Sequence, residues 1–272
     1  MVLCRKWRAY YDRSMFLNRR STQEEYFDLP NRGLAEVAEG YRLLNRVNRI
    51  VQNAGPFRRI VPGWLGEDRC RRLSFLDLGS GNGQLGHELA MWAPHRGWDW
   101  VFTNLDLNPL SLQLNARGCN VAGSAMALPF RDGSFDVVIG TQMTHHLRDE
   151  AAVTQHFAEA WRVSREAVFI HDLHRNIVFY SLLWLLLVAL RVPAQFRADG
   201  LLSVARGWRV SEFKALAERA GMVGARVRLD FGSRVFLLAR KPMIEFSVHD
   251  RQGGCGAEGS TVPGHGFSWW FA

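Results

Sequence analysis

The chain has few cysteines, and they do not form a motif. Its 272 residues include four, all widely separated in the sequence: Cys4, Cys70, Cys119 and Cys255. This spacing fits neither a disulfide framework nor a cysteine-based metal site. We therefore expect a protein of the reducing cytoplasm, and we expect no metal centre.

Targeting segments and long apolar runs are also scarce. The first 14 residues, MVLCRKWRAYYDRS, include basic side chains but no apolar core, so they do not resemble a secretory signal. The uncharged, mostly apolar run from Ile177 to Leu190 would form a helix about 21 Å long. Because the hydrocarbon core of a bilayer is about 30 Å thick, we do not expect this run to span a membrane.

Arginine and lysine outnumber the acidic residues, and most of this excess lies in the N-terminal part of the sequence. The formal net charge is +8, of which residues 1–72 carry +7 and residues 73–272 carry +1. An excess of arginine in the N-terminal segment is compatible with a solvated basic face, with peripheral contact to an anionic membrane, or with nucleic acid. No base-reading or RNA-stacking motif accompanies it, so we do not expect a nucleic-acid partner.

The sequence divides into four segments. We expect a flexible extension over residues 1–20 and an N-terminal helical segment over 21–72, in which apolar residues recur at three- and four-residue steps. The helical pattern ends at residue 50, and the stretch GPFRRIVPGWLGE (55–67) indicates a linker. Residues 242–272 are rich in glycine, serine and proline, which is typical of a disordered tail.

Strand and helix patterns alternate over residues 73–241. Helices are expected over 83–93, 109–118, 148–164 and 211–221, and strands over 73–78, 98–106, 119–123, 134–140, 166–172, 222–230 and 233–240. The alternation predicts an α/β fold, a Rossmann-like doubly wound parallel sheet. Only Phe231 and Gly232 separate the last two strands, so the final strand should be antiparallel.

A glycine-rich turn follows the first predicted strand. Gly81, Gly83 and Gly86 fit the dinucleotide pattern, and Asp106 lies 20 residues beyond Gly86, so an NAD(P)-dependent oxidoreductase is one interpretation. Asp77 argues against it, because a carboxylate at the end of that strand would repel a diphosphate. The same carboxylate suits a cofactor that carries an ammonium and a sulfonium group, such as S-adenosylmethionine.

Three runs of the sequence carry a family resemblance. FLDLGSGNG (75–83), NLDLNP (104–109) and GSAMALPFRDGSFDVVIG (123–140) resemble class I S-adenosylmethionine-dependent methyltransferases, in particular the UbiE-like small-molecule branch. The resemblance implies a seven-stranded sheet with a reversed last strand. It also implies a set of residues around the methionine, ribose and adenine parts of the cofactor: Asp77, Gly79, Ser80, Gly81, Gly83, Asp106, Leu107, Ser124, Ala125, Met126 and Thr141.

One position departs from the family pattern. Ser124 occupies the place where these enzymes have an aspartate that accepts from the adenine amino group. A neutral acceptor should weaken cofactor binding by about 1 kcal/mol without abolishing it. This departure keeps a second alternative open, a cofactor-binding partner protein that has no catalytic activity of its own.

Several histidines follow the fourth and fifth predicted strands, where ligands bind in open α/β sheets. His145, His146 and His171 are candidate general bases, and Asp172 is a candidate to orient one of them. The resemblance implies methyl transfer to oxygen or carbon of a hydrophobic small molecule, aromatic and polyketide- or quinone-like. Oligomeric state is not predictable from these patterns.

An insertion over about 174–205 contains the apolar run and is expected to form a lid. A helix that is apolar on every face must pack in the core, cover a hydrophobic substrate, or touch lipid, and all three roles are open. Asp199 and Arg206, in and just after this insertion, could reach the pocket, but we expect surface positions for both. On the N-terminal helix, Asn45 and Arg49 share a face and are candidates to reach the cofactor or substrate.

Overall fold

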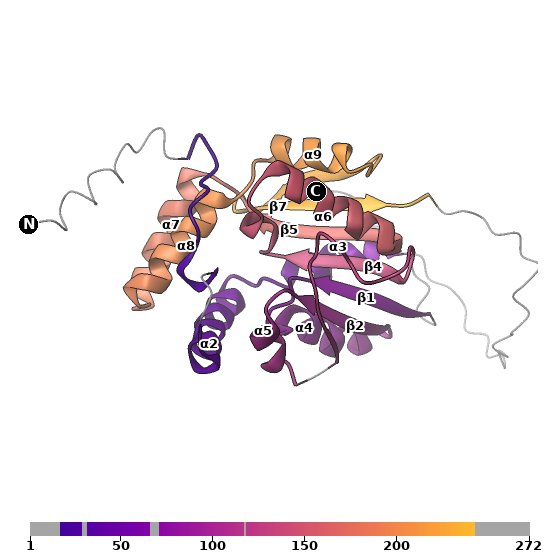
Figure 1. The fold of residues 1–272 in the computed structure, drawn as a ribbon, viewed down its shortest axis with the longest axis horizontal. Helices are drawn as coiled ribbons and strands as arrows, with labels where there is room; N and C mark the ends of the chain where they lie inside the picture. Colours follow the sequence, from indigo (N-terminus) through magenta and orange to yellow (C-terminus); the bar gives the residue numbers. More distant parts are fainter. Residues whose placement is uncertain (1–16, 29–31, 66–70, 117, 243–272) are drawn as a thin grey trace, which may run out of the picture. The chain divides into compact units, whose positions relative to one another are not determined.

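A computed structural model describes residues 17–28, 32–65, 71–116 and 118–242. The chain divides into two units, residues 1–241 and 242–272. The predicted disordered tail from residue 243 onward lies outside the described residues, as does the predicted extension up to residue 16. Figure 1 shows how the helices and strands of the first unit are arranged.

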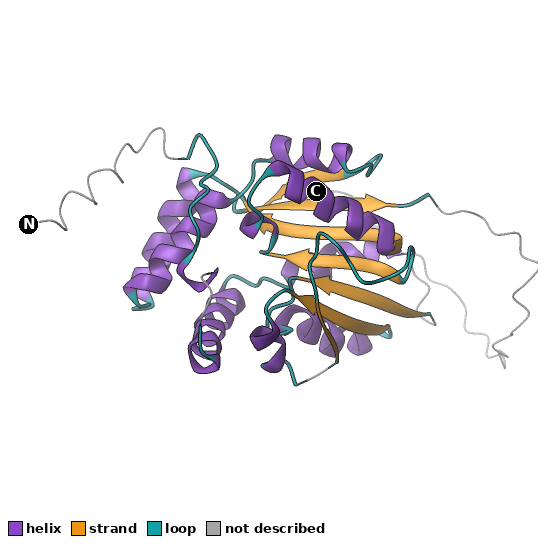
Figure 2. Cartoon of the chain, viewed as in Figure 1, coloured by secondary structure: helices purple, strands orange, loops and turns teal. Residues whose placement is uncertain are grey.

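A mixed sheet forms the centre of this unit (Figure 2). Its seven strands lie in the order β3-β2-β1-β4-β5-β7-β6. All neighbouring pairs are parallel except that β7 is antiparallel to both β5 and β6, which confirms the predicted reversed strand. The bounds are β1 Arg72–Leu78, β2 Asp99–Asp106, β3 Cys119–Ala122, β4 Phe135–Thr141, β5 Ser164–Leu173, β6 Arg226–Asp230 and β7 Arg234–Arg240.

Helices cover both faces of the sheet. Along β4, Val138 packs into one buried cluster with Phe157 and Phe213, whereas Val137 and Ile139 pack into the cluster on the other face. The alternation follows from the two-residue period of a strand. The helices and turns are η1 Tyr26–Asp28, α2 Leu34–Ile50, α3 Gly55–Leu65, α4 Gln84–Trp92, η2 Ala93–Arg96, α5 Pro109–Gln113, η3 Thr144–His146, α6 Glu150–Val163, α7 Ile177–Ala189, α8 Ala194–Arg206 and α9 Val210–Arg219.

The prediction of a linker after residue 50 is wrong, because α3 occupies most of that stretch. Phe57, Ile60 and Val61 recur at helical spacing and are all buried. Burying each of them is worth about 1.5–3 kcal/mol, which together outweighs the ~3 kcal/mol that a proline inside a helix costs. Pro62 therefore lies within the helix, and the proline content that suggested a linker was misleading.

The prediction of a flexible extension over residues 1–20 is wrong for residues 17–20, which pack against the rest of the chain. Leu17 is buried. The Arg20 guanidinium donates to the carbonyl oxygens of His145 at 2.6 Å and Arg206 at 2.8 Å, and also to those of Leu147 and Arg148. Arginine content suggested a solvated segment, but this arginine ties the chain to the turn after β4 and to the end of α8.

Helices α7 and α8 pack on each other beyond the carboxyl ends of the parallel strands, and α2 lies near them (Figure 1). Val47 of α2 packs against Leu187 of α7 and against Val192. Among the described residues, no helix has the length and apolar character needed to cross a bilayer. The three helices enclose the space above the strand ends.

Candidate active site

One large cavity opens at the carboxyl ends of the parallel strands. Its volume is about 1150 Å³, larger than the ~300–1,000 Å³ of most ligand pockets. Strand ends and the turns after β1, β2 and β4 form its floor, and side chains from α2, α7 and α8 form its walls. The cavity is therefore large enough for two ligands side by side.

Asp77, at the end of β1, is a buried carboxylate that lines this cavity. Neither of its oxygens has a partner that meets full hydrogen-bond geometry among the described residues, and the backbone N–H of Gly86 interacts with it only weakly. Burial raises the pKa of Asp77 to about 8, with a contribution from Asp106, and the nearby backbone amide of Gly86 partly offsets the rise. A buried carboxylate so weakly paired is costly, so the site fits a ligand that brings a cation to it and disfavours a phosphate.

The glycine turn brings the backbone close to neighbouring side chains. Gly79 and Gly81 have φ values of +62° and +56°, and a Cβ at Gly79 would lie 2.2 Å from the Met143 side chain. Both glycines line the cavity. Gly83 does not; it precedes α4, and a Cβ there would lie 2.1 Å from Asn115. Its role in the structure is therefore to let α4 begin close to that side chain.

Asp106 ends β2 and faces the glycine turn. One carboxylate oxygen accepts the backbone N–H of Gly81 and the other that of Asn108, each at 2.8 Å. Burial raises the pKa of Asp106, and these two amides oppose the increase. The Ser80 hydroxyl, also in the cavity lining, is buried and has no partner among the described residues. These acceptors suit the hydroxyl groups of a ribose.

The remaining residues predicted to bind the cofactor line the same cavity. Leu107, at 74% exposure, presents an open apolar surface, and the Ser124 hydroxyl accepts the backbone N–H of Met126 at 3.2 Å. The Thr141 hydroxyl exchanges hydrogen bonds with Asn53. Of the eleven predicted cofactor residues, the cavity is lined by ten, namely Asp77, Gly79, Ser80, Gly81, Asp106, Leu107, Ser124, Ala125, Met126 and Thr141.

His145 lies in η3 and lines the cavity, and its orientation is fixed by Asp172 of β5. Its Nδ1 lies 2.6 Å from Asp172 Oδ1, and its backbone N–H donates to Asp172 Oδ2 at 2.8 Å. Burial alone would raise the pKa of Asp172, but His145 and the backbone amides hold it below the usual value. An ionised carboxylate at Nδ1 leaves His145 Nε2 directed away from it as a proton acceptor.

His146, the next residue, is engaged differently. Its Nδ1 lies 2.9 Å from Asp28 Oδ2. Burial opposes the charged form, yet Glu25 and Asp28 raise the pKa of His146 to about 9. His146 and Arg206 in turn lower the pKa of Asp28 to about 2 against the effect of burial. The two carboxylates thus favour the charged form of His146, which does not favour its predicted role as a base.

His171 does not line the cavity. It is completely buried between Phe57 and Phe236, with Nδ1 3.3 Å from the Thr141 hydroxyl. Burial, reinforced by Arg234, lowers its pKa far below the usual value. In this position His171 contacts Thr141 from the core side of the sheet edge, and its burial does not favour its predicted role as a general base.

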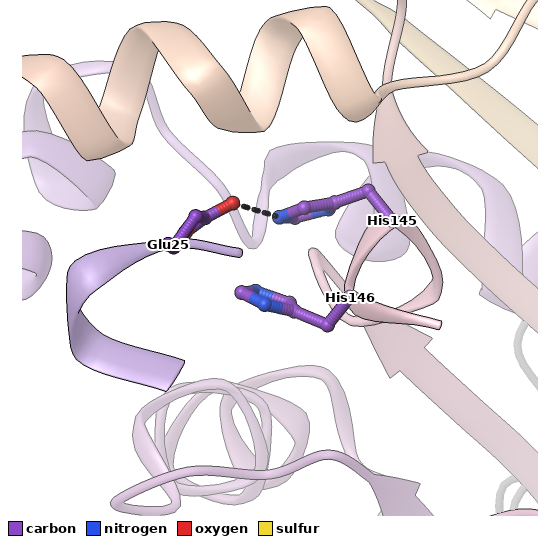
Figure 3. Close-up of side chains that lie close together, drawn as sticks. All are labelled: Glu25, His145 and His146. Carbon is purple, nitrogen blue, oxygen red and sulfur yellow. Dashed lines mark ion pairs between the residues drawn. The ribbon is translucent and has the colours of Figure 1, made fainter. Parts of the chain in front are cut away.

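Glu25 completes a cluster with His145 and His146 (Figure 3), and the sequence analysis missed it. Its Oε1 lies 3.8 Å from His145 Nε2, accepts from the Ser203 hydroxyl at 2.8 Å and lies 3.6 Å from Arg206. The three side chains are close enough to hold a metal ion. The adjacent Arg206 guanidinium and the protonated His146 make the cluster better suited to moving a proton than to binding a divalent cation.

Asp199 and Arg206, for which we expected surface positions, are both buried and line the cavity. Asp199 accepts the backbone N–H groups of Tyr26 and Phe27, and Arg206 pairs with Asp28 at 2.9 Å. That expectation is wrong because the N-terminal segment folds over α8 and buries both charges. Nothing in the local pattern around these residues signals so distant a partner.

The N-terminal helix α2 contributes one cavity wall. Asn45 lines the cavity, whereas Arg49 is exposed and does not. Asn48 accepts from the Gln142 amide at 3.1 Å. Tyr41, which the sequence analysis did not single out, lies against Gly81 and donates to the Ser111 hydroxyl at 3.0 Å. It therefore covers the glycine turn, at the point where the cofactor is expected.

Comparisons with known proteins agree with this geometry. Residues 76–170 match the family described as methyltransferase domain. The chain is 33% identical over 136 residues to the demethylmenaquinone methyltransferase of Roseiflexus castenholzii, covering 49% of this chain and 55% of that protein. It is 34% identical over 135 residues to the protein of the same name from Deinococcus radiodurans, covering 47% and 53%. The chain thus spans about half the length of the curated relatives it matches.

A solved structure supports the fold assignment. The structure of PigF with SAH superposes with a TM-score of 0.54 at 18% identity, covering 80% of this chain and 63% of that one. The matched domain and the fold together define a class: residues 76–170 are similar to methyltransferase domains and lie in a sheet of the same fold as that structure. Within that class it is similar to the UbiE-like, demethylmenaquinone-type methyltransferases.

Proposed function

We propose that the chain transfers a methyl group from S-adenosylmethionine to an oxygen or carbon atom of an apolar, aromatic small molecule. The observation that carries the proposal is Asp77, a buried carboxylate without a full hydrogen-bond partner in the cavity wall. S-adenosylmethionine, when bound, supplies an electrophilic methyl group on a sulfonium. Asp77 would hold its ammonium group, Asp106 its ribose hydroxyls, and the wall from Ser124 to Met126 its adenine ring.

The part of the cavity beyond these residues supports an apolar acceptor. Phe179, Leu183 and Leu187 of α7 and Phe196 of α8 line it. An aromatic substrate buried among them is held in place and kept from water, which is the main contribution a protein makes to an in-line displacement. The names of the related proteins, demethylmenaquinone methyltransferases, make a quinone-like acceptor the first one to test.

We assign the general base to His145. A phenol or enol is a better nucleophile after losing its proton, and His145 Nε2 is positioned to take it while Asp172 holds Nδ1. Glu25, 3.8 Å from Nε2, would stabilise the imidazolium that results. His146 lacks this capacity while it remains protonated by its pairing with Asp28.

A methyl-transfer assay tests the proposal. The full chain is incubated with S-adenosylmethionine that carries a labelled methyl group and with a panel of phenols, hydroquinones and aromatic polyketides. The proposal expects label in at least one organic product, with S-adenosylhomocysteine released in equal amount. Cofactor binding without labelled product across the panel favours the alternative of a catalytically silent partner protein, for which Ser124 is the sequence feature.

A further inference from the structure

Helix α7 has two apolar sides with different surroundings. Phe179, Leu183 and Leu187 recur at four-residue steps and line the cavity, and Leu187 is completely buried. The opposite side carries apolar side chains that are 40–66% exposed, and no described residue covers them: Ile177, Val178, Leu182, Trp184, Leu185 and Val188. We call these six residues the outer face of α7. Soluble proteins seldom expose so many large apolar side chains together without a partner.

Two further exposed apolar residues lie beside α7. Ile50, the last residue of α2, and Phe231, at the tip of the β6–β7 hairpin, line a small cleft together with Phe179. Phe231 is 84% exposed, and its ring carries the Arg59 guanidinium at 4.8 Å. These two exposed side chains therefore lie beside Phe179, at the cavity side of α7, and Phe231 forms an aromatic–arginine pair.

The exposed charges on α7, α8 and the loop between them have one sign, whereas Arg59 beside the hairpin is paired with Asp230. Between residues 177 and 206 the only acidic side chain is Asp199, which is buried and bonded to backbone amides. Arg191 is exposed and Arg197 is half-buried at the α7–α8 end of the surface. Two copies meeting through the outer face of α7 would bring like charges together, whereas an anionic surface would meet opposite ones.

We propose that the outer face of α7 docks onto an anionic lipid bilayer. Thirteen residues form α7, a length of about 20 Å, so the helix would lie in the interface rather than cross it. Its outer side chains would enter the acyl boundary while Arg191 and Arg197 meet lipid headgroups. Because the inner side of the same helix lines the cavity, an apolar acceptor dissolved in the bilayer would enter beside α7.

The experiment is sedimentation of the full chain with vesicles. We expect binding to phosphatidylcholine vesicles that contain phosphatidylglycerol and much weaker binding to phosphatidylcholine alone. Leu182→Glu combined with Leu185→Glu should weaken binding at least about tenfold, because two charges would have to enter the acyl boundary. The matched control is Met91→Glu combined with Val223→Glu, which changes two exposed apolar residues on α4 and between α9 and β6 and should leave binding unchanged.

A second readout does not depend on how the charged variants fold. Lipids brominated in the acyl chain should quench the fluorescence of Trp184. The chain has ten tryptophans, so the Trp184→Phe variant, which should lose this quenching, shows that the signal comes from Trp184. The proposal is overturned by equal binding of both vesicle types, by binding that survives Leu182→Glu with Leu185→Glu, or by a dimer that these changes dissociate. The docking proposal rests on the proposed function only for the chemistry of the acceptor. Vesicle binding needs no turnover, so the vesicle experiment and an assay of methyl transfer to a water-soluble phenol can fail independently of each other.

Discussion

Asp172 holds His145 through two contacts at once, one to the imidazole Nδ1 at 2.6 Å and one to the backbone N–H at 2.8 Å. Both groups are buried, and the free edge of the imidazole faces Glu25 and the cavity. Asp172 and Glu25 thus contact the two ring nitrogens of His145, the arrangement on which the proposed general base rests. This relationship distinguishes His145 from the other two candidate histidines.

His145→Ala should lower kcat by about a hundredfold, since a positioned base typically contributes about 10²–10⁴. Binding of S-adenosylhomocysteine should stay within about threefold of wild type, because His145 lies outside the cofactor half of the cavity. Added imidazole should restore part of the rate, a response that a structural role would not produce. His95→Gln, at an exposed histidine in η2, is the matched control. An unchanged kcat would remove His145 from the mechanism.

Asp172 acts through His145, so we treat it as a positioning residue. Asp172→Asn should lower kcat at least about tenfold by favouring the wrong tautomer, with little change in KM. Equal losses of kcat and of S-adenosylhomocysteine affinity would instead point to a general disturbance of β5.

The pairing of Asp28 with His146 should make stability depend on pH. The pKa of His146 rises from 6.5 to about 9 on folding, so its contribution is complete below pH 6.5 and is lost as the pH rises through 9. The pKa of Asp28 falls to about 2, so its contribution is lost only in strong acid. Urea unfolding should therefore show that His146→Gln is more destabilising at pH 6 than at pH 9.5. A difference independent of pH would contradict the ion pair.

Ser124→Asp should tighten cofactor binding. An aspartate accepts the same hydrogen bond as an anion, which is worth about 1 kcal/mol more, or about fivefold in Kd. Calorimetry with S-adenosylhomocysteine measures this directly, and Ser134→Asp, which changes a half-buried loop serine outside the cavity lining, controls for the added charge. Equal or weaker binding would show that Ser124 does not occupy the position of the family aspartate.

Methyl transfer should not need a metal ion, although Glu25, His145 and His146 lie within 4.8 Å of one another. Arg206 already neutralises part of their charge. Activity should survive dialysis against a strong chelator, and added zinc should not raise it. Loss of activity on chelation, restored by a divalent cation, would assign the cluster to metal binding.

Local patterns in the sequence predict most of this fold and most of the cofactor site. Strand alternation and the short hairpin around Phe231 are encoded locally, and so is the order of Asp77, the glycines and Asp106. Helix α3 was missed because its prolines locally indicate a linker. The burial of Phe57, which outweighs them, depends on tertiary packing and leaves no local signal. Glu25 and Asp28 reach the site only because the N-terminal segment folds over α8, a contact between residues more than a hundred positions apart.

The choice between His145 and His146 shows the same limit. The two are neighbours in the sequence, and the residues around them give no reason to prefer either. Backbone geometry in η3 directs one imidazole to Asp172 of β5 and the other to Asp28 of the N-terminal segment. These different carboxylate partners, which lie far apart in the sequence, distinguish the two histidines.

The most direct test of the account measures S-adenosylhomocysteine and NADPH binding by calorimetry at pH 6 and pH 8, for the wild type and for Asp77→Asn. The pKa of Asp77 is about 8 without a ligand, so its carboxylate becomes available as the pH rises. We predict that the affinity of the wild type for S-adenosylhomocysteine increases from pH 6 to pH 8. In Asp77→Asn this affinity should be at least about tenfold weaker. Neither protein should bind NADPH. NADPH binding that Asp77→Asn strengthens would contradict the account.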